Sequence, residues 1–150
     1  METTDKVQFF TNLVGKKCWS TVAGPGTGSM VSLAFGERIR RAVPIKNLTL
    51  PVEQREFTGE FVIFLKCGSW QIERGGKIVC NSNHSNKVGD VMLAGLNQLV
   101  GKIVTSVDSA VGLSDFVLNL DGGLRLGVTC AQDINVTDCY TLHHLEPLRS

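Results

Sequence analysis

The sequence predicts a mainly β fold of the β-rich α+β type, built from two duplicated β-units that each carry a short helix. The tetrapeptide Leu-Val-Gly-Lys at 13–16 returns at 99–102, and the alternating apolar pattern of 31–35 returns at 116–120. Alternation with a period of two is typical of strands that are buried on one face. Two copies are too few for a stacked array, so the repeat predicts one duplicated supersecondary unit.

A further observation is the Asp-Gly-Gly sequence at 121–123, which separates two alternating apolar runs. Asp-Gly between such runs is a strong hairpin pattern. We therefore expect a single domain over residues 1–150, made of related halves at about 1–82 and 83–150. These halves would form a pseudo-two-fold sandwich or a continuous sheet that curls into a partial barrel.

The first half begins with a predicted helix. Val7 and Phe10 have helical spacing, a threonine at position 3 or 4 can cap the N-terminus, and the helix ends before Gly15. Residues 16–22 then predict a first strand.

Residues 31–43 predict a β-hairpin that turns at Gly36 and Glu37, because apolar residues alternate on both sides of this pair. The second strand of the hairpin aligns with 124–128 of the second half. In that alignment Arg41 is a misfit, because it takes a position that faces inward.

Residues 44–60 have no counterpart in the second half. Pro44 ends the preceding strand, since proline cannot donate a ladder hydrogen bond. Long insertions often carry function. This one mixes apolar with charged residues, as protein interfaces do, although the apolar residues could equally pin the loop to the core.

The remaining strands follow in order. The apolar run 61–65 predicts a central strand covered on both faces. Residues 70–72 and 77–80 predict a hairpin around the glycine pair between them.

The second half repeats the first. Asp90 can cap a helix over 91–96, and 102–107 predicts a strand before the Asp-Gly-Gly hairpin. Residues 140–142 repeat the aromatic, polar, aliphatic order of 70–72, so both halves close with the same kind of strand.

The composition argues against several classes of function. The formal net charge of +1 gives no global field for nucleic acid or membranes, and no apolar run reaches the length of a membrane span. The acidic, polar N-terminus does not resemble a signal peptide, so we expect a cytoplasmic protein. The five cysteines form no Cys-x-x-Cys pair. We interpret them as small buried apolar residues in a reducing compartment, without a disulfide framework.

No catalytic or cofactor motif stands out. The glycine-rich loop 24–28 contains a proline and leads into a strand, so it is a poor phosphate cradle. Cys130, Cys139, His143 and His144 match no zinc-site spacing, and adjacent histidines on a strand point to opposite faces. We expect no catalytic residue, no cofactor and no metal.

At 13–16, 70–72 and 99–102 the chain resembles small uncharacterised bacterial β-rich proteins with duplicated Leu-Val-Gly and Trp-x-Leu/Ile units. Some of these look like immunity proteins, which bind and block the toxin of an antibacterial system. Tyr140 departs from the tryptophan pattern, and the insertion after Pro44 has no matching element. The resemblance implies a non-enzymatic binding protein and no particular site residue.

The predicted function is therefore that of a cytoplasmic partner-binding protein, an immunity protein that neutralises a bacterial toxin. It would use the insertion and the basic strand before it. An alternative is a small-molecule-binding or hydrolytic enzyme with a pocket between the halves, built on Cys80, His84 or His143. The oligomeric state is left open. The candidate partner-binding residues are Arg38, Arg40, Arg41, Lys46, Glu53, Arg55, Glu56 and Glu60.

Overall fold

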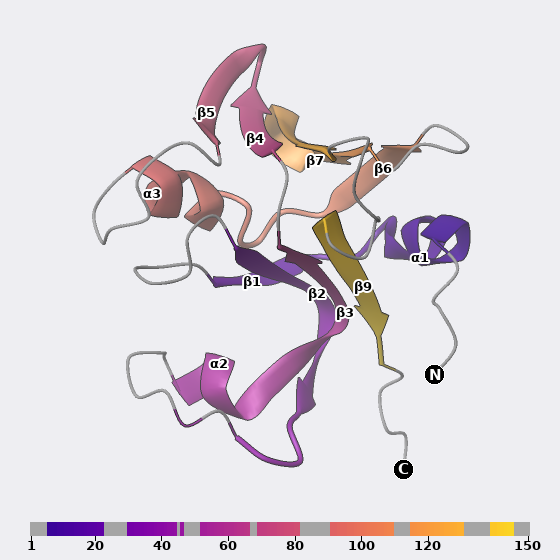
Figure 1. The fold of residues 1–150 in the computed structure, drawn as a ribbon, viewed down its shortest axis with the longest axis vertical. Coiled ribbons are helices and arrows are strands. Elements are labelled where there is room, and N and C mark those ends of the chain that lie inside the picture. Colours follow the sequence, from indigo (N-terminus) through magenta and orange to yellow (C-terminus); the bar gives the residue numbers. More distant parts are fainter. Residues whose placement is uncertain are drawn as a thin grey trace.

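The protein folds into two antiparallel sheets flanked by short helices (Figure 1). The computed structural model describes residues 6–22, 30–44, 46, 52–66, 69–81, 91–109, 115–130 and 139–145. The first half contains α1 (Lys6–Leu13), β1 (Cys18–Val22), β2 (Val31–Arg40), α2 (Val52–Glu56), β3 (Phe57–Leu65), β4 (Ser69–Arg74) and β5 (Lys77–Asn81). The second contains α3 (Val91–Asn97), β6 (Val104–Ser109), β7 (Phe116–Leu120), the 3-10 turn η1 (Asp121–Gly123), β8 (Leu124–Thr129) and β9 (Tyr140–His144).

The first sheet has the strand order β1-β2-β3-β9, and the second has the order β5-β4-β8-β7-β6. Neighbouring strands are antiparallel throughout both sheets. The predicted mainly β fold is confirmed, and the described strands form two sheets rather than a closed barrel. The predicted caps at position 3 or 4 and at Asp90, and the loop 24–28, lie outside the described residues.

Each half gives its closing strand to the sheet of the other half. β4 follows β3 along the chain but pairs with β8, and β9 follows β8 but pairs with β3. Trp70 lies opposite Val128, and Tyr140 lies opposite Leu65, so the aromatic heads of the two closing strands take equivalent places. Neither half completes a sheet by itself.

The two copies of Leu-Val-Gly-Lys meet where the sheets join. The N–H of Cys18 donates to the carbonyl of Lys102 at 2.9 Å, and the N–H of Val104 donates to the carbonyl of Lys16 at 3.0 Å. Cys18 and Val104 hold the same place in their copies, as do the two lysines. The pair of hydrogen bonds is therefore the local signature of the predicted pseudo-two-fold symmetry.

The core lies between the inward faces of the two sheets, where Leu33 and Ile63 of the first sheet and Leu126 of the second are fully buried. Helix α1 adds two rings to it. Phe9 packs edge to face on Phe61 at 5.4 Å between centroids, and the next residue, Phe10, contacts Phe116 at 4.8 Å. The helical spacing predicted for α1 therefore serves to bury aromatic rings against both sheets.

Helices α1 and α3 hold equivalent places in the two halves but differ at one buried position. Leu96 and Leu99 of the α3 segment are buried like Phe10 and Leu13, but the equivalent of Phe9 is Gly95. A Cβ at Gly95 would lie 2.4 Å from the sulfur of Cys80. Cys80 belongs to β5, the strand with no counterpart in the first sheet. The glycine makes room for that extra strand.

The hairpin predicted to turn at Gly36 and Glu37 is wrong. β2 runs straight through this pair and stays paired with β3, and the two residues form a bulge between Phe35 and Arg38. Gly36 has φ of +83°, which a bulge needs as much as a turn does. Period-two alternation continues on both sides of either feature, so the pattern could not separate them.

The bulge also corrects the alignment of the halves. Phe35 pairs with Phe61, so 61–65, and not 39–43, is the equivalent of 124–128 in the second half. Arg41 is no longer a misfit, and Val43, which the alignment placed opposite the buried Val128, is 73% exposed. β3 is a central strand as predicted, although its outward residues Val62 and Phe64 are only half-buried.

Candidate functional site

The described residues of the stretch 36–60, which are 36–44, 46 and 52–60, form an arm that stands out from the sheets (Figure 1). It consists of the outer ends of β2 and β3 with α2 between them. Between the equivalent strands of the second half the chain makes only the short turn η1. The extra segment therefore begins at the bulge, earlier than the predicted 44–60.

Three of the predicted residues meet near the tip of the arm. The Arg40 guanidinium lies 4.7 Å from the centroid of the Phe57 ring, and its Nη1 is 3.4 Å from Oε1 of Glu56. The N–H of Arg41 donates to the carbonyl of Glu56 at 2.7 Å, and its Nε donates to the carbonyl of Phe57 at 3.2 Å. Partial burial lowers the pKa of the Arg41 guanidinium. The outer ends of β2 and β3 are thus held together by arginine side chains, which contact the Phe57 ring and its backbone carbonyl.

Arg38 has a different aromatic partner from Arg40. Arg38 stacks on the ring of Trp19, with 5.0 Å between its Cζ and the ring centroid. Lys46 is exposed and Arg55 is half-buried. The side chain of Glu53 lies outside the described part of the structure.

Glu60 lies at the base of the arm, opposite the bulge, and is one of the two buried polar residues among those described. Its Oε1 is 3.5 Å from Nζ of Lys16 and accepts the N–H of Glu37 at 3.3 Å. A Cβ at Gly36 would lie 2.5 Å from the same oxygen. Glu60 is therefore a structural residue of the bulge and is not free to meet a partner.

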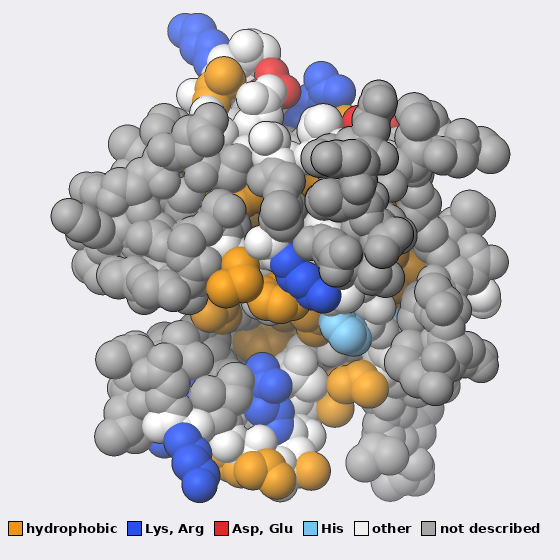
Figure 2. Space-filling model, in the orientation of Figure 1, with side chains coloured by type: hydrophobic (Ala, Val, Ile, Leu, Met, Phe, Trp, Pro, Cys, Tyr) orange, Lys and Arg blue, Asp and Glu red, His pale blue; other side chains and the backbone are white. Residues whose placement is uncertain are grey.

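Apolar side chains are exposed on the same arm. Val43 is 73% exposed and Val52 is 58% exposed. Figure 2 shows hydrophobic side chains beside lysine and arginine side chains in the region of α2 and the outer ends of β2 and β3. Among the described arm residues, the exposed apolar side chains lie with a small excess of basic residues. Glu56 and Glu60 are engaged in ion pairs, and Glu37 is an exposed acidic residue.

The prediction for the cysteines is wrong for one pair. Cys130 and Cys139 form a disulfide, with 5.9 Å between their Cα atoms. It closes the loop that carries the chain from β8 in the second sheet to β9 in the first. The sequence separation of 9 residues gave no sign of it, because the pairing depends on where the exchanged strand β9 docks.

The cysteine and histidine side chains proposed for an enzyme site are not brought together among the residues described. Cys80 lies buried under α3, where desolvation raises its thiol pKa to about 11. Cys18 is buried as well, with a pKa of about 12, so neither thiol is activated. His143 contacts Thr141 on one face of β9, and His144 stacks on Phe61 on the other, as the strand pattern predicted. His84 lies outside the described residues.

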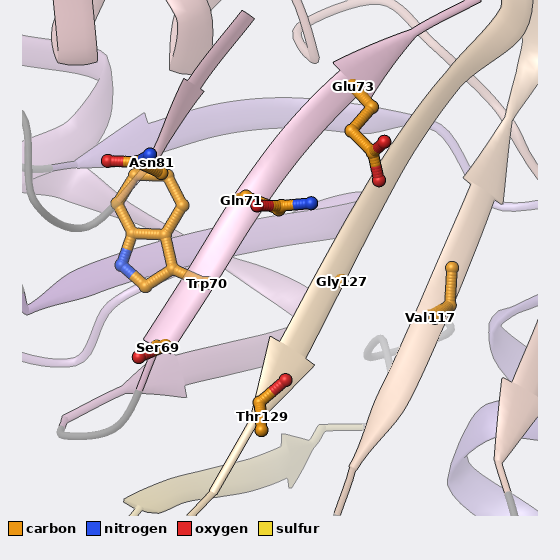
Figure 3. Close-up of a pocket in the computed structure, with 8 residues that line it drawn as sticks. All are labelled: Ser69, Trp70, Gln71, Glu73, Asn81, Val117, Gly127 and Thr129. Carbon is orange, nitrogen blue, oxygen red and sulfur yellow. The ribbon is translucent and has the colours of Figure 1, made fainter. Parts of the chain in front are cut away.

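A hollow of about 340 Å³, which no sequence motif predicted, opens on the outer face of the second sheet (Figure 3). Its walls come from β4 and β8, with Gln71 and Glu73 on one and Thr129 on the other. Gly127 leaves the floor between them bare. An isolated glycine inside a predicted strand was the available clue, since such glycines often mark a close approach.

Comparison with known proteins gives no assignment: no family model fits the sequence, and neither a curated protein nor a solved structure matches it. Within the described ranges, no three histidine, cysteine or acidic side chains are grouped as metal ligands. No described helix is long and apolar enough to span a membrane.

Proposed function

We propose that this chain is a non-enzymatic binding protein that docks on another protein through the arm. The observation that carries the proposal is that residues 36–60 extend one half of a duplicated fold where the other half has a three-residue turn. The outer arm adds little to the core, yet it is held in shape by stacked and paired side chains. An arm whose described residues are held in this way and expose apolar side chains is suited to recognition.

The charges on the arm favour an acidic partner surface. Arg40 is 68% exposed at its side chain while it lies on Phe57, which leaves one edge of the guanidinium for a second carboxylate. Val43 and Val52 supply apolar contacts beside it. An apolar centre with an arginine anchor is the composition of an interface hot spot. We further propose that the partner is a toxin and that binding neutralises it, as the resemblance to immunity proteins implies.

Because the fold is duplicated, the second half shows how the arm can be removed without disturbing the sheets. In the second half, the N–H of Asp121 donates to the carbonyl of Ile103 at 3.0 Å, and its Oδ1 accepts the N–H of Ile103 at 2.9 Å. In the first half, Gly36 donates to Lys17, the equivalent of Ile103, at 2.9 Å. Replacing residues 36–60 by Asp-Gly-Gly should therefore give a second copy of the same turn. This armless variant keeps both sheets.

The experiment is affinity capture from the native cell lysate with tagged wild-type and armless protein, followed by mass spectrometry. One stoichiometric protein that is captured by the wild type and lost with the arm supports the proposal. A point variant, Arg40→Glu, should weaken capture and make it less salt-dependent, whereas Arg125→Glu on the second sheet should not. Equal capture by the armless protein, or no capture by folded wild type, would contradict the proposal.

The compartment is part of the proposal. We place the binding reaction in the cytoplasm, where thiols are kept reduced. The Cys130–Cys139 disulfide argues for an oxidising compartment instead. Alkylation of protein taken directly from its native cells, with mass spectrometry of the two cysteines, tests this point. Alkylated cysteines support the cytoplasm, and an unreacted disulfide would move the protein to an oxidising compartment.

A further inference from the structure

We propose that the hollow on the outer face of the second sheet binds a small saccharide through Gln71, Glu73 and the bare backbone at Gly127 (Figure 3). This site lies on β4, β7 and β8, away from the arm, and it does not depend on the function proposed for the arm. The volume of about 340 Å³ is near the lower end of the range for ligand pockets, roughly 300–1,000 Å³.

The first observation is that no structural reason for Gly127 is visible. It lies in β8 between Gln71 of β4 and Val117 of β7, in the interior of a five-stranded sheet. Its φ is not in the left-handed region, and an added Cβ would come no closer than 4.0 Å to Val117. Glycine inside a strand is unfavourable by roughly 0.5–1 kcal/mol relative to alanine. A ligand that approaches the backbone closely would account for it.

The internal symmetry gives an independent comparison. The position equivalent to Gly127 in the first sheet is Phe64, which lies between Thr141 and Ser32. The same place in the same kind of sheet therefore accepts a large side chain. The hollow exists because the second copy has a glycine there.

The polar side chains that line the hollow indicate the class of ligand. Ser69 and Thr129 face each other across the strands, and the Gln71 amide and Glu73 carboxylate follow along β4. Hydroxyl and amide groups both donate and accept hydrogen bonds, as sugar hydroxyls do, and a carboxylate accepts from them. The side chains of Gln71 and Glu73 make no hydrogen bond or ion pair among the residues described. The described residues that line the hollow include no lysine or arginine, and Arg125 lies opposite the lining residue Glu73 on β8.

The polar groups are arranged around an apolar surface. Figure 3 shows the Gln71 and Glu73 side chains reaching toward β8, with Val117 beyond the open floor at Gly127. A sugar ring laid on this floor would contact Val117 with a carbon-bound face and present its hydroxyls to the polar walls.

The test uses an immobilised glycan panel and a set of methyl glycosides, with wild-type protein and Gly127→Phe. The variant copies the residue of the first sheet, and we expect it to keep its melting temperature while it loses binding at least tenfold. The local readout is the NMR shift of the Gly127 backbone amide and the Gln71 side-chain amide on titration with a binding glycoside. Gln71→Ala should weaken binding, and Thr141→Ala, at the equivalent place in the first sheet, should not.

The outcomes of this test either support or overturn the proposed saccharide site. Glycan binding that is lost in Gly127→Phe and Gln71→Ala, and kept in Thr141→Ala and in the armless protein, supports the site. No binding of any saccharide by the wild type, or shifts confined to other amides, would overturn it. If Gly127→Phe does not fold, Gln71→Ala and Glu73→Gln carry the same test.

Discussion

Lys17 and Ile103 face each other in an isolated antiparallel bridge, which joins the two sheets at the pseudo-two-fold axis. On either side of them, Gly15 donates its N–H to the carbonyl of Val104 and Gly101 donates its N–H to the carbonyl of Cys18, both at 2.7 Å. Both glycines have φ of +91°. The backbone is thus duplicated at the axis down to the hydrogen bonds.

Because their surroundings match, Gly15→Ala and Gly101→Ala should destabilise the protein equally. An added Cβ meets nothing within 4 Å at either site, so the loss comes only from the left-handed backbone, about 1–2 kcal/mol each. Denaturant unfolding measures it. Gly127→Ala is the control, without a left-handed φ, and should be neutral or slightly stabilising. Clearly unequal losses at the two sites would argue against the symmetric axis.

Gly95→Ala should destabilise more than a surface substitution, because its Cβ would lie 2.4 Å from Sγ and 2.7 Å from Cβ of Cys80. Overpacking of this kind costs about 1–3 kcal/mol. Cys80→Ala removes only the sulfur, so the double variant should recover part of the loss. A double-mutant cycle from urea unfolding checks the coupling. Strictly additive effects would contradict the close packing of α3 on β5.

Removing the Cys130–Cys139 disulfide should destabilise the protein by about 2–3 kcal/mol, the chain-entropy expectation for a short closed loop. The change is Cys130→Ser together with Cys139→Ser. Unfolding of the wild type should shift with added reductant, and unfolding of the double variant should not. If reductant leaves the wild type unchanged, the bond either is absent in solution or contributes nothing.

Stability should fall at alkaline pH. Burial raises the thiol pKa of Cys18 from 9.0 to about 12, and burial with the nearby Asp115 carboxylate raises the pKa of Tyr140 from 10.0 to about 12. Both groups stay protonated in the folded state while the unfolded chain loses its protons. The stability they add is complete below pH 9 and is lost toward pH 12, by up to about 1.4 kcal/mol per pH unit for each group.

Urea unfolding between pH 8 and about 11, the range in which these shifts act, measures the slope. Cys18→Ala and Tyr140→Phe should each flatten it and leave a smaller difference from the wild type at high pH than at neutral pH. A wild-type stability that is constant over this range would show that neither group is shifted.

Local pattern was enough to predict most elements. Alternating residues placed β7 and β8 around Asp121, and the helical spacing of Phe10 placed α1, because these features depend on neighbours in the chain. The bulge at Gly36 was missed, since a glycine there serves a bulge or a turn equally well. The arm could be recognised as extra sequence, but the engagement of Glu60 by Lys16 could not, because these residues lie far apart in the chain.

The repeated apolar positions were enough to predict a duplicated β fold, because they dictate which faces must be buried. How the two copies combine could be read only from the folded chain. The exchange of β4 and β9, the disulfide at Cys130 and the hollow over Gly127 all depend on which strand lies beside which. Strand order is set by long-range pairing and core packing, which neighbouring residues do not encode.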